Sequence, residues 1–219
     1  MPSHIGNVSI RYKTTTEALN KIAGSADLPQ SLREVLADAS TMADLLNAIP
    51  DCPKLDPDTW QDVLISLSYR LLGFSSLNDQ HKCDLASRLW HTALLTFMTT
   101  CFPQFGRRRF LPNTLLSTLL KNILQETRLD GSRQTTQLRL WMMVIGDVSL
   151  FDEADRPWLL PELQAAIQTL GVRDFSALHD VLRLFPWLDI THGSSAERLW
   201  ECVSKSALAR PVSERALTM

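Results

Sequence analysis

A short stretch near the end of the chain, FPWLDITHGSSAERLWECV from Phe185 to Val203, contains the residues best suited to chemistry. Asp189 and His192 are three residues apart, so on a helix they would share a face and the carboxylate could orient the imidazole. With Glu197 nearby, this is a minimal set for general acid–base catalysis. No nucleophile stands at a recognisable turn, however. The sequence therefore favours a polar pair that stabilises the loop before the last helix, with a catalytic Asp189–His192 pair as the alternative.

The other histidines and the cysteines do not form a metal or cofactor motif. His91 and His179 lie within apolar helical patterns, where a packing role is expected. His81 and Cys83 are two residues apart and would point to different faces of a helix. The cysteines show no C-x-x-C spacing, and no glycine-rich phosphate loop is present, so we expect no metal and no cofactor. The four cysteines are Cys52, Cys83, Cys101 and Cys202.

The charge balance argues against a free-standing DNA-binding module. The chain of 219 residues has 22 Lys and Arg against 24 Asp and Glu, a net charge of −2. DNA-binding modules are usually basic, because phosphate contacts supply most of their non-specific affinity. The densest basic run, Arg107–Arg109, is expected to be a solvated loop before a helix, and a phosphate or acidic-partner contact is the alternative.

Targeting and membrane signals are weak. The amino-terminal residues have no apolar core typical of a secretory signal. No segment approaches the ~18–20 apolar residues of a membrane span, since Arg139 and Asp147 interrupt the best candidate, LRLWMMVIGDVSLF. We therefore expect an intracellular protein that does not enter a membrane, located in the nucleus or cytoplasm.

Helical spacing dominates the chain, and strand signals are weak. The pattern predicts an all-α fold, with about nine or ten helices in a single domain over residues 1–209 and a flexible tail over 210–219. Residues 140–145 are apolar on every side, which is typical of a central helix. The first fifty residues predict two or three short helices, Thr15–Ile22, Ser31–Ala39 and Thr41–Ile49, with Ser40 as a cap between the last two.

Caps, prolines and glycines place the remaining helix boundaries. The predicted starts are Asp56–Pro57, Asn78 or Asp79, Pro112, Asp155 or Pro161, and Ser194 or Ser195, the last with a capping box to Glu197. The predicted stops are Gly73, Pro103, Gly171 and Pro186.

Six tryptophans are spread over different predicted helices or helix ends. Each can cover a large apolar area and fix how two helices cross, so core anchoring is the simplest role. The alternative is that a subset lines an apolar ligand pocket between helices. The six are Trp60, Trp90, Trp141, Trp158, Trp187 and Trp200.

The order of landmarks in the second half resembles the fungal-specific transcription factor domain, the regulatory region that accompanies fungal zinc-cluster DNA-binding modules. The resemblance covers about 65 residues well and extends more loosely back to Arg70. It implies an all-helical regulatory region in which FPWLD and its surroundings are structural. The matching segments are LWMMVIG at 140–146, WLLP at 158–161, LGVRDF at 170–175, FPWLD at 185–189, His192, and RLWE at 198–201.

One feature of that family is missing. Its zinc cluster needs six cysteines in a short basic stretch, and this chain has four, widely separated. We therefore expect a transcription-regulatory protein without its own DNA-binding module and without direct sequence-specific DNA binding. It would act by binding a protein partner (a transcription factor or a second copy) or a small apolar metabolite, with secondary-metabolite gene control as one setting. The alternative is a helical enzyme or pericyclase-like protein with a Trp-lined apolar pocket.

Overall fold

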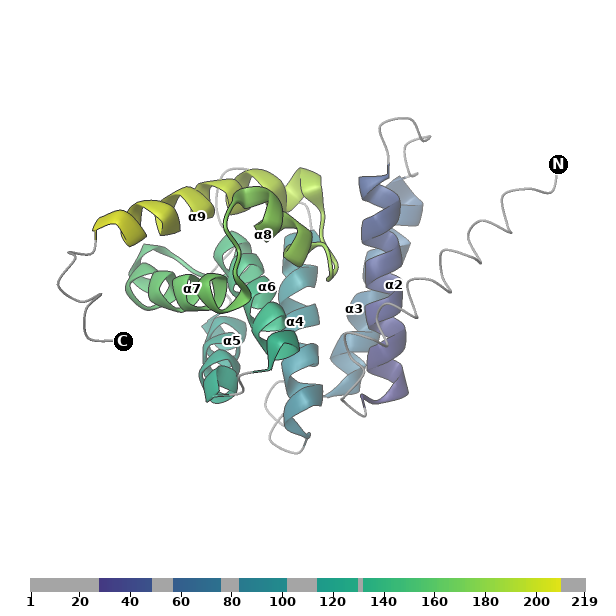
Figure 1. Ribbon diagram of the computed structural model, residues 1–219. Coiled ribbons are helices and arrows are strands. Elements are labelled where there is room, and N and C mark those ends of the chain that lie inside the picture. Colours follow the sequence, from purple (N-terminus) through teal and green to yellow (C-terminus); the bar gives the residue numbers. More distant parts are fainter. Residues whose placement is uncertain (1–27, 49–56, 76–82, 102–113, 130–131, 210–219) are drawn as a thin grey trace.

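The computed structural model describes residues 28–48, 57–75, 83–101, 114–129 and 132–209, and this part of the chain is all-helical with no strand (Figure 1). The all-α prediction is thus confirmed. Eight α-helices and two short 3₁₀ helices are present in these ranges: α2 (Gln30–Asn47), α3 (Pro57–Phe74), α4 (Leu85–Cys101), α5 (Thr114–Glu126), η2 (Thr127–Leu129), α6 (Arg133–Ser149), η3 (Glu153–Asp155), α7 (Arg156–Leu170), α8 (Phe175–Leu182) and α9 (Asp189–Ala209).

Helix α6 lies at the centre of the bundle, as its all-round apolar sequence predicts. Every residue from Leu138 to Gly146 is buried. The helix packs against α4, α5, α7, α8 and α9 and lies among them in Figure 1. The buried apolar side chains form one cluster that includes residues from α2 to α9. Gly146 allows a close approach here, because a Cβ atom at this position would lie 2.5 Å from the Phe151 ring. None of the described helices combines the length and hydrophobicity that crossing a bilayer requires.

The predicted break at Ser40 is wrong, because α2 is one continuous helix. Its buried side chains recur at three- and four-residue intervals straight through this position. Ser40 is itself buried, and its hydroxyl has no hydrogen-bond partner. The neighbouring Thr41 donates its hydroxyl to the carbonyl of Ala37 within the helix. Two predicted helices are therefore one, and the predicted helix Thr15–Ile22 lies outside the described residues, so eight α-helices are described against the nine or ten expected for the chain.

Helix α4 begins later than predicted, at Leu85 rather than at Asn78 or Asp79. Cys83 and Asp84 are not helical, and Asp84 caps the helix. Its Oδ1 accepts from the backbone N–H of Ser87 at 2.9 Å, and its Oδ2 accepts the Ser87 hydroxyl at 2.6 Å. These bonds, with others from the backbone nearby, lower the pKa of the Asp84 carboxyl.

Helix α7 contains Pro161 in its interior, so the predicted start at that proline is wrong. The helix begins at Arg156, directly after Asp155, which is the other start that the sequence predicts. The 3₁₀ helix η3 precedes it directly, and a capping box between Asp152 and Asp155 stabilises the start of η3. The predicted stop at Gly171 is confirmed: this residue has φ 70° and ψ 26°, the left-handed conformation that glycine adopts without strain.

Two further boundaries differ from prediction at the carboxy-terminal end. Helix α8 ends at Leu182, before the predicted stop at Pro186. Helix α9 begins at Asp189, five residues before Ser194, so neither Ser194 nor Ser195 is its cap. Tertiary contacts to Asp189, described below, supply the capping that the serines were expected to give.

Several predicted features lie outside the described residues. These are the helix Thr15–Ile22, the boundaries at Asp56, Pro103 and Pro112, the basic run Arg107–Arg109, the residues Cys52 and His81, and the tail 210–219.

Replacing each of two serines by alanine tests the revised helix boundaries. Ser132 is a true N-cap that accepts from the Thr135 N–H, so Ser132→Ala is expected to lower the free energy of unfolding by about 1 kcal/mol. Ser40→Ala removes an unpaired buried hydroxyl from a helix interior and is expected to leave this free energy unchanged or to raise it by up to ~1 kcal/mol. Urea denaturation measures the free energy of unfolding of both variants. An equal decrease in the two would indicate that Ser40 also caps a helix and would contradict the continuous α2.

Candidate functional site

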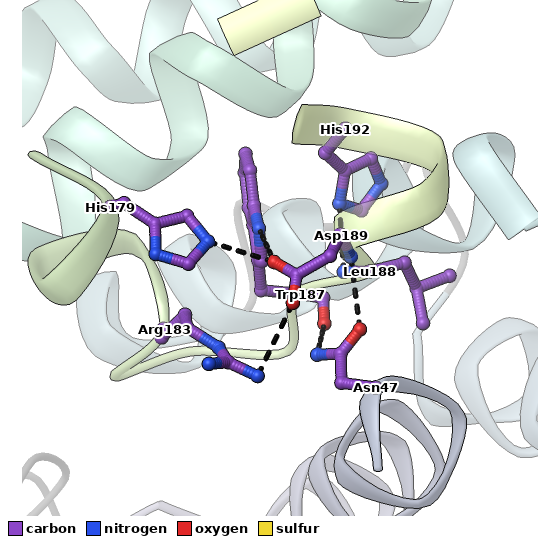
Figure 2. A network of polar contacts seen from close by, with 7 residues as sticks. All are labelled: Asn47, His179, Arg183, Trp187, Leu188, Asp189 and His192. Carbon is purple, nitrogen blue, oxygen red and sulfur yellow. Dashed lines mark hydrogen bonds and ion pairs between the residues drawn. The ribbon is translucent and has the colours of Figure 1, made fainter. Parts of the chain in front are cut away.

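The side chain of Asp189 is the centre of a polar network at the start of α9 (Figure 2). Its Oδ1 accepts from His179 Nε2 at 2.8 Å and from Trp187 Nε1 at 2.9 Å. Its Oδ2 lies 3.3 Å from an Arg183 guanidinium nitrogen. The carboxylate therefore connects the loop before α9 to helix α8 and the turn that follows it, and it stands at the helix N-terminus, where a negative charge is stabilised.

Asn47, the last residue of α2, holds the same loop from the opposite side (Figure 2). Its side-chain N–H donates to the Trp187 carbonyl at 2.6 Å, and its Oδ1 accepts from the Asp189 backbone N–H at 2.9 Å. The first N–H groups of a helix have no partner within the helix, so Asn47 caps α9 from about 140 residues away in the sequence. This long-range cap explains why α9 begins at Asp189.

His192 lies on α9 and is completely buried, with 0% of its surface exposed. Its Nδ1 accepts from the Leu188 backbone N–H at 3.1 Å, which requires an unprotonated Nδ1 and places the proton on Nε2. Nε2 then donates to the Thr100 hydroxyl at 2.8 Å, and that hydroxyl donates to the Phe97 carbonyl. Burial lowers the pKa of His192 to about 4, although the nearby negative charge of Asp189 opposes this shift.

Asp189 and His192 thus belong to one region but do not form a hydrogen-bonded pair. The Asp189 carboxylate faces His179, whereas the His192 ring bonds to the Leu188 backbone and to α4. A neutral ring with both nitrogens bonded and no exposed surface has no atom to offer a substrate. The catalytic alternative stays a prediction that this geometry does not favour.

The residues that complete this network could not be found from the sequence pattern. Asn47 and Thr100 carry no local signal, since their partners are 142 and 92 residues away. His179 was expected only to pack; its ring does contact Phe175 and Trp187, but it also bonds to Asp189.

The remaining predicted polar residues lie apart from the network or act only in packing. His91 is the packing residue expected from sequence: it is buried, bonds to the Leu71 carbonyl at 2.8 Å, and has its pKa lowered by burial. Glu197 and Arg198 are exposed on α9, and Arg198 bonds to Ser195 rather than to the turn before the helix.

The tryptophans pack in the core, which is the simpler of the two roles considered. Trp90, Trp141 and Trp187 are buried members of the apolar cluster, and the other three are partly buried against it. The Trp141 ring stacks on Phe185 with centroids 5.2 Å apart, and its indole N–H donates to the Pro186 carbonyl. These contacts attach the FPWLD segment to the central helix.

A groove of about 580 Å³ lies between α2 and α3, within the size range of small-molecule sites. Apolar side chains from both helices line it, together with an ion pair in which an Arg70 nitrogen lies 2.5 Å from Asp38 Oδ2. A smaller cavity, of about 270 Å³, lies between α5, α6 and α7, and Trp158 is among the residues that line it.

Metal-ligating groups do not gather in the described part of the chain. No cluster of three or more His, Cys, Asp or Glu residues there could hold a metal ion. The described cysteines are Cys83, Cys101 and Cys202, all of them free thiols. Cys101 is buried, and this burial raises its pKa to about 12, so the thiolate that would bind metal or attack a substrate does not form near neutral pH.

Comparison of the chain with protein-family models, characterised proteins and solved structures found no significant match.

Asn47→Ala is expected to lower the free energy of unfolding by about 2 kcal/mol, because it leaves the Asp189 N–H and the Trp187 carbonyl without their partner. Gln30→Ala removes an amide from the exposed surface of the same helix and should change the free energy by less than about 0.5 kcal/mol. Denaturant unfolding compares the two variants. Equal stability would show that the network does not hold α9 in place.

Proposed function

We propose that the chain is a regulatory protein of fungal transcription that acts by binding a partner or a small metabolite, without its own DNA-binding module. The groove between α2 and α3 is the contact surface in this proposal. The order of sequence landmarks from Leu140 to Glu201 supports the family, and the all-helical fold agrees with it.

The observation that carries the proposal is the contrast between the polar network and the groove. The groups best suited to acid–base chemistry are bonded to one another or to the backbone, as His192 is. The groove, in contrast, is open and lined by apolar side chains such as Leu45, which is 41% exposed although it is large and apolar. An exposed apolar surface of this kind is typical of a binding site.

The enzyme alternative has less support from the geometry. A catalytic cavity needs polar groups that converge on a substrate and are available to it. In the groove, Asp38 is paired with Arg70, which also lies 3.8 Å from Glu34. Among the described residues that line the groove there is no imidazole or thiol.

Gene replacement in the source organism tests the proposal. Deletion of the gene is expected to change the abundance of a defined set of transcripts, measured by RNA sequencing. An allele with Leu45→Lys should change the same set, because a charge in the groove costs apolar binding energy.

A matched allele, Leu184→Lys, serves as the control. Leu184 is also 41% exposed but lies in the turn after α8 and does not line the groove. The strain that carries Leu184→Lys should therefore have the same transcript abundances as the wild type. Unchanged transcripts after deletion would contradict a role in transcription. A deletion phenotype that Leu45→Lys does not reproduce would contradict the groove as the contact surface.

A further inference from the structure

The cavity between α5, α6 and α7 combines buried positive charge with an apolar wall. Arg139 on α6 lines it, and only 10% of the Arg139 side chain is exposed. The Nε of Arg139 is buried and has no hydrogen-bond partner among the described residues. A buried guanidinium donor without an acceptor is unusual, because such groups are normally paired.

The charges of the described residues that line the cavity do not balance. Among these residues, two guanidiniums, Arg128 and Arg139, face one carboxylate, Glu162, which leaves one positive charge in excess. Glu162 accepts from Arg139 at 3.1 Å through Oε2 and lies 3.2 Å from Arg128 through Oε1. The Nε of Arg139 takes no part in this contact, so Arg139 does not pair with Glu162 through Nε and a terminal nitrogen together, as a guanidinium can with a carboxylate.

The rest of the lining is apolar. Leu124 and Met143 contribute aliphatic surface, and Trp158 contributes an aromatic ring. The indole N–H of Trp158 is already bonded to Asp155 Oδ1 at 3.1 Å. Trp158 therefore contributes apolar ring surface to the cavity and no free hydrogen-bond donor. The volume of about 270 Å³ suits a molecule with a single ring or a short branched chain.

We propose that this cavity binds a small organic monocarboxylate, with its carboxylate held by Arg128 and Arg139 and its apolar body against Trp158 and Met143. A single negative charge matches the excess positive charge of the lining, whereas a phosphate would bring close to two negative charges beside Glu162. The apolar wall excludes an inorganic anion as the preferred ligand, because such an ion would leave that wall uncovered.

This site is separate from the groove between α2 and α3, so its existence does not depend on the regulatory role proposed above. In Figure 1, α2 and α3 lie on one side of α4 and α6, and α5 and α7 lie on the other. A metabolite bound here would contact the central helix α6 directly, through Arg139 and Met143.

Titration with two probes of the same shape tests the proposal on the full chain. Phenylacetate has the required carboxylate and ring, and phenylacetamide replaces the charge by a neutral amide. The indole N–H resonance of Trp158, followed by ¹H–¹⁵N NMR, reports binding at this cavity. We expect phenylacetate to bind about tenfold more tightly than phenylacetamide, because its bonds to the guanidiniums are charge-assisted.

Two charge-removing variants complete the experiment. Arg128 is 67% exposed, so Arg128→Gln should fold normally and should reduce the preference for phenylacetate severalfold. Arg33→Gln removes the same charge from the exposed surface of α2 and should retain the preference. Equal affinity for both probes, an unchanged preference in Arg128→Gln, or the absence of any shift at Trp158 would each overturn the proposal.

Discussion

The start of α9 is held by side chains from three other helices, and the arrangement of the described chain depends on this junction. Asn47 from α2 caps the helix, the Thr100 hydroxyl from α4 accepts a hydrogen bond from His192 Nε2, and His179 from α8 bonds to Asp189. These contacts join segments that are far apart in the sequence. They also surround the loop whose Trp187 and Phe185 rings pack into the apolar cluster.

The same junction bears on the catalytic alternative for Asp189 and His192. The catalytic reading of Asp189 and His192 requires a polar pair open to a substrate, and the structure uses both groups for internal hydrogen bonds. Because Asp189 and both ring nitrogens of His192 have hydrogen-bond partners, this network adds specificity to the packing without creating an uncompensated charge. Our two binding proposals therefore concern other surfaces: the groove between α2 and α3, and the arginine-lined cavity on the far side of α4 and α6.

The sequence predicted those features that depend on local or periodic signals. The apolar run at 140–145 indicated a central helix, and α6 is buried along that run; the glycine at 171 indicated a stop, and it has a left-handed backbone. Ser40 misled the prediction because tertiary burial of a continuous apolar stripe outweighs the weak preference of one serine for a cap. Pro161 misled it because α7 continues through the proline, with Leu159 and Leu163 buried on either side, although a proline inside a helix costs roughly 3 kcal/mol.

The candidate site was predictable only in part. Its location in FPWLDITH was found, as was the presence of a local polar arrangement before the last helix. The helix start at Asp189 was not, because Asn47 supplies the cap from 142 residues away and leaves no pattern near Ser194. The role of His192 was also out of reach, since the buried bond to Thr100 and the packing of the Trp187 ring depend on how α4 and α9 meet.

The protonation state of His192 tests the central claim most directly. This ring is a buried structural element with its proton on Nε2, which donates to the Thr100 hydroxyl. Ring ¹⁵N chemical shifts of His192, assigned by comparison with His192→Gln, should therefore show this neutral tautomer at pH 7 and no protonation until about pH 4. A ring that titrates near the ordinary histidine pKa of about 6.5 would show an accessible imidazole and contradict the account.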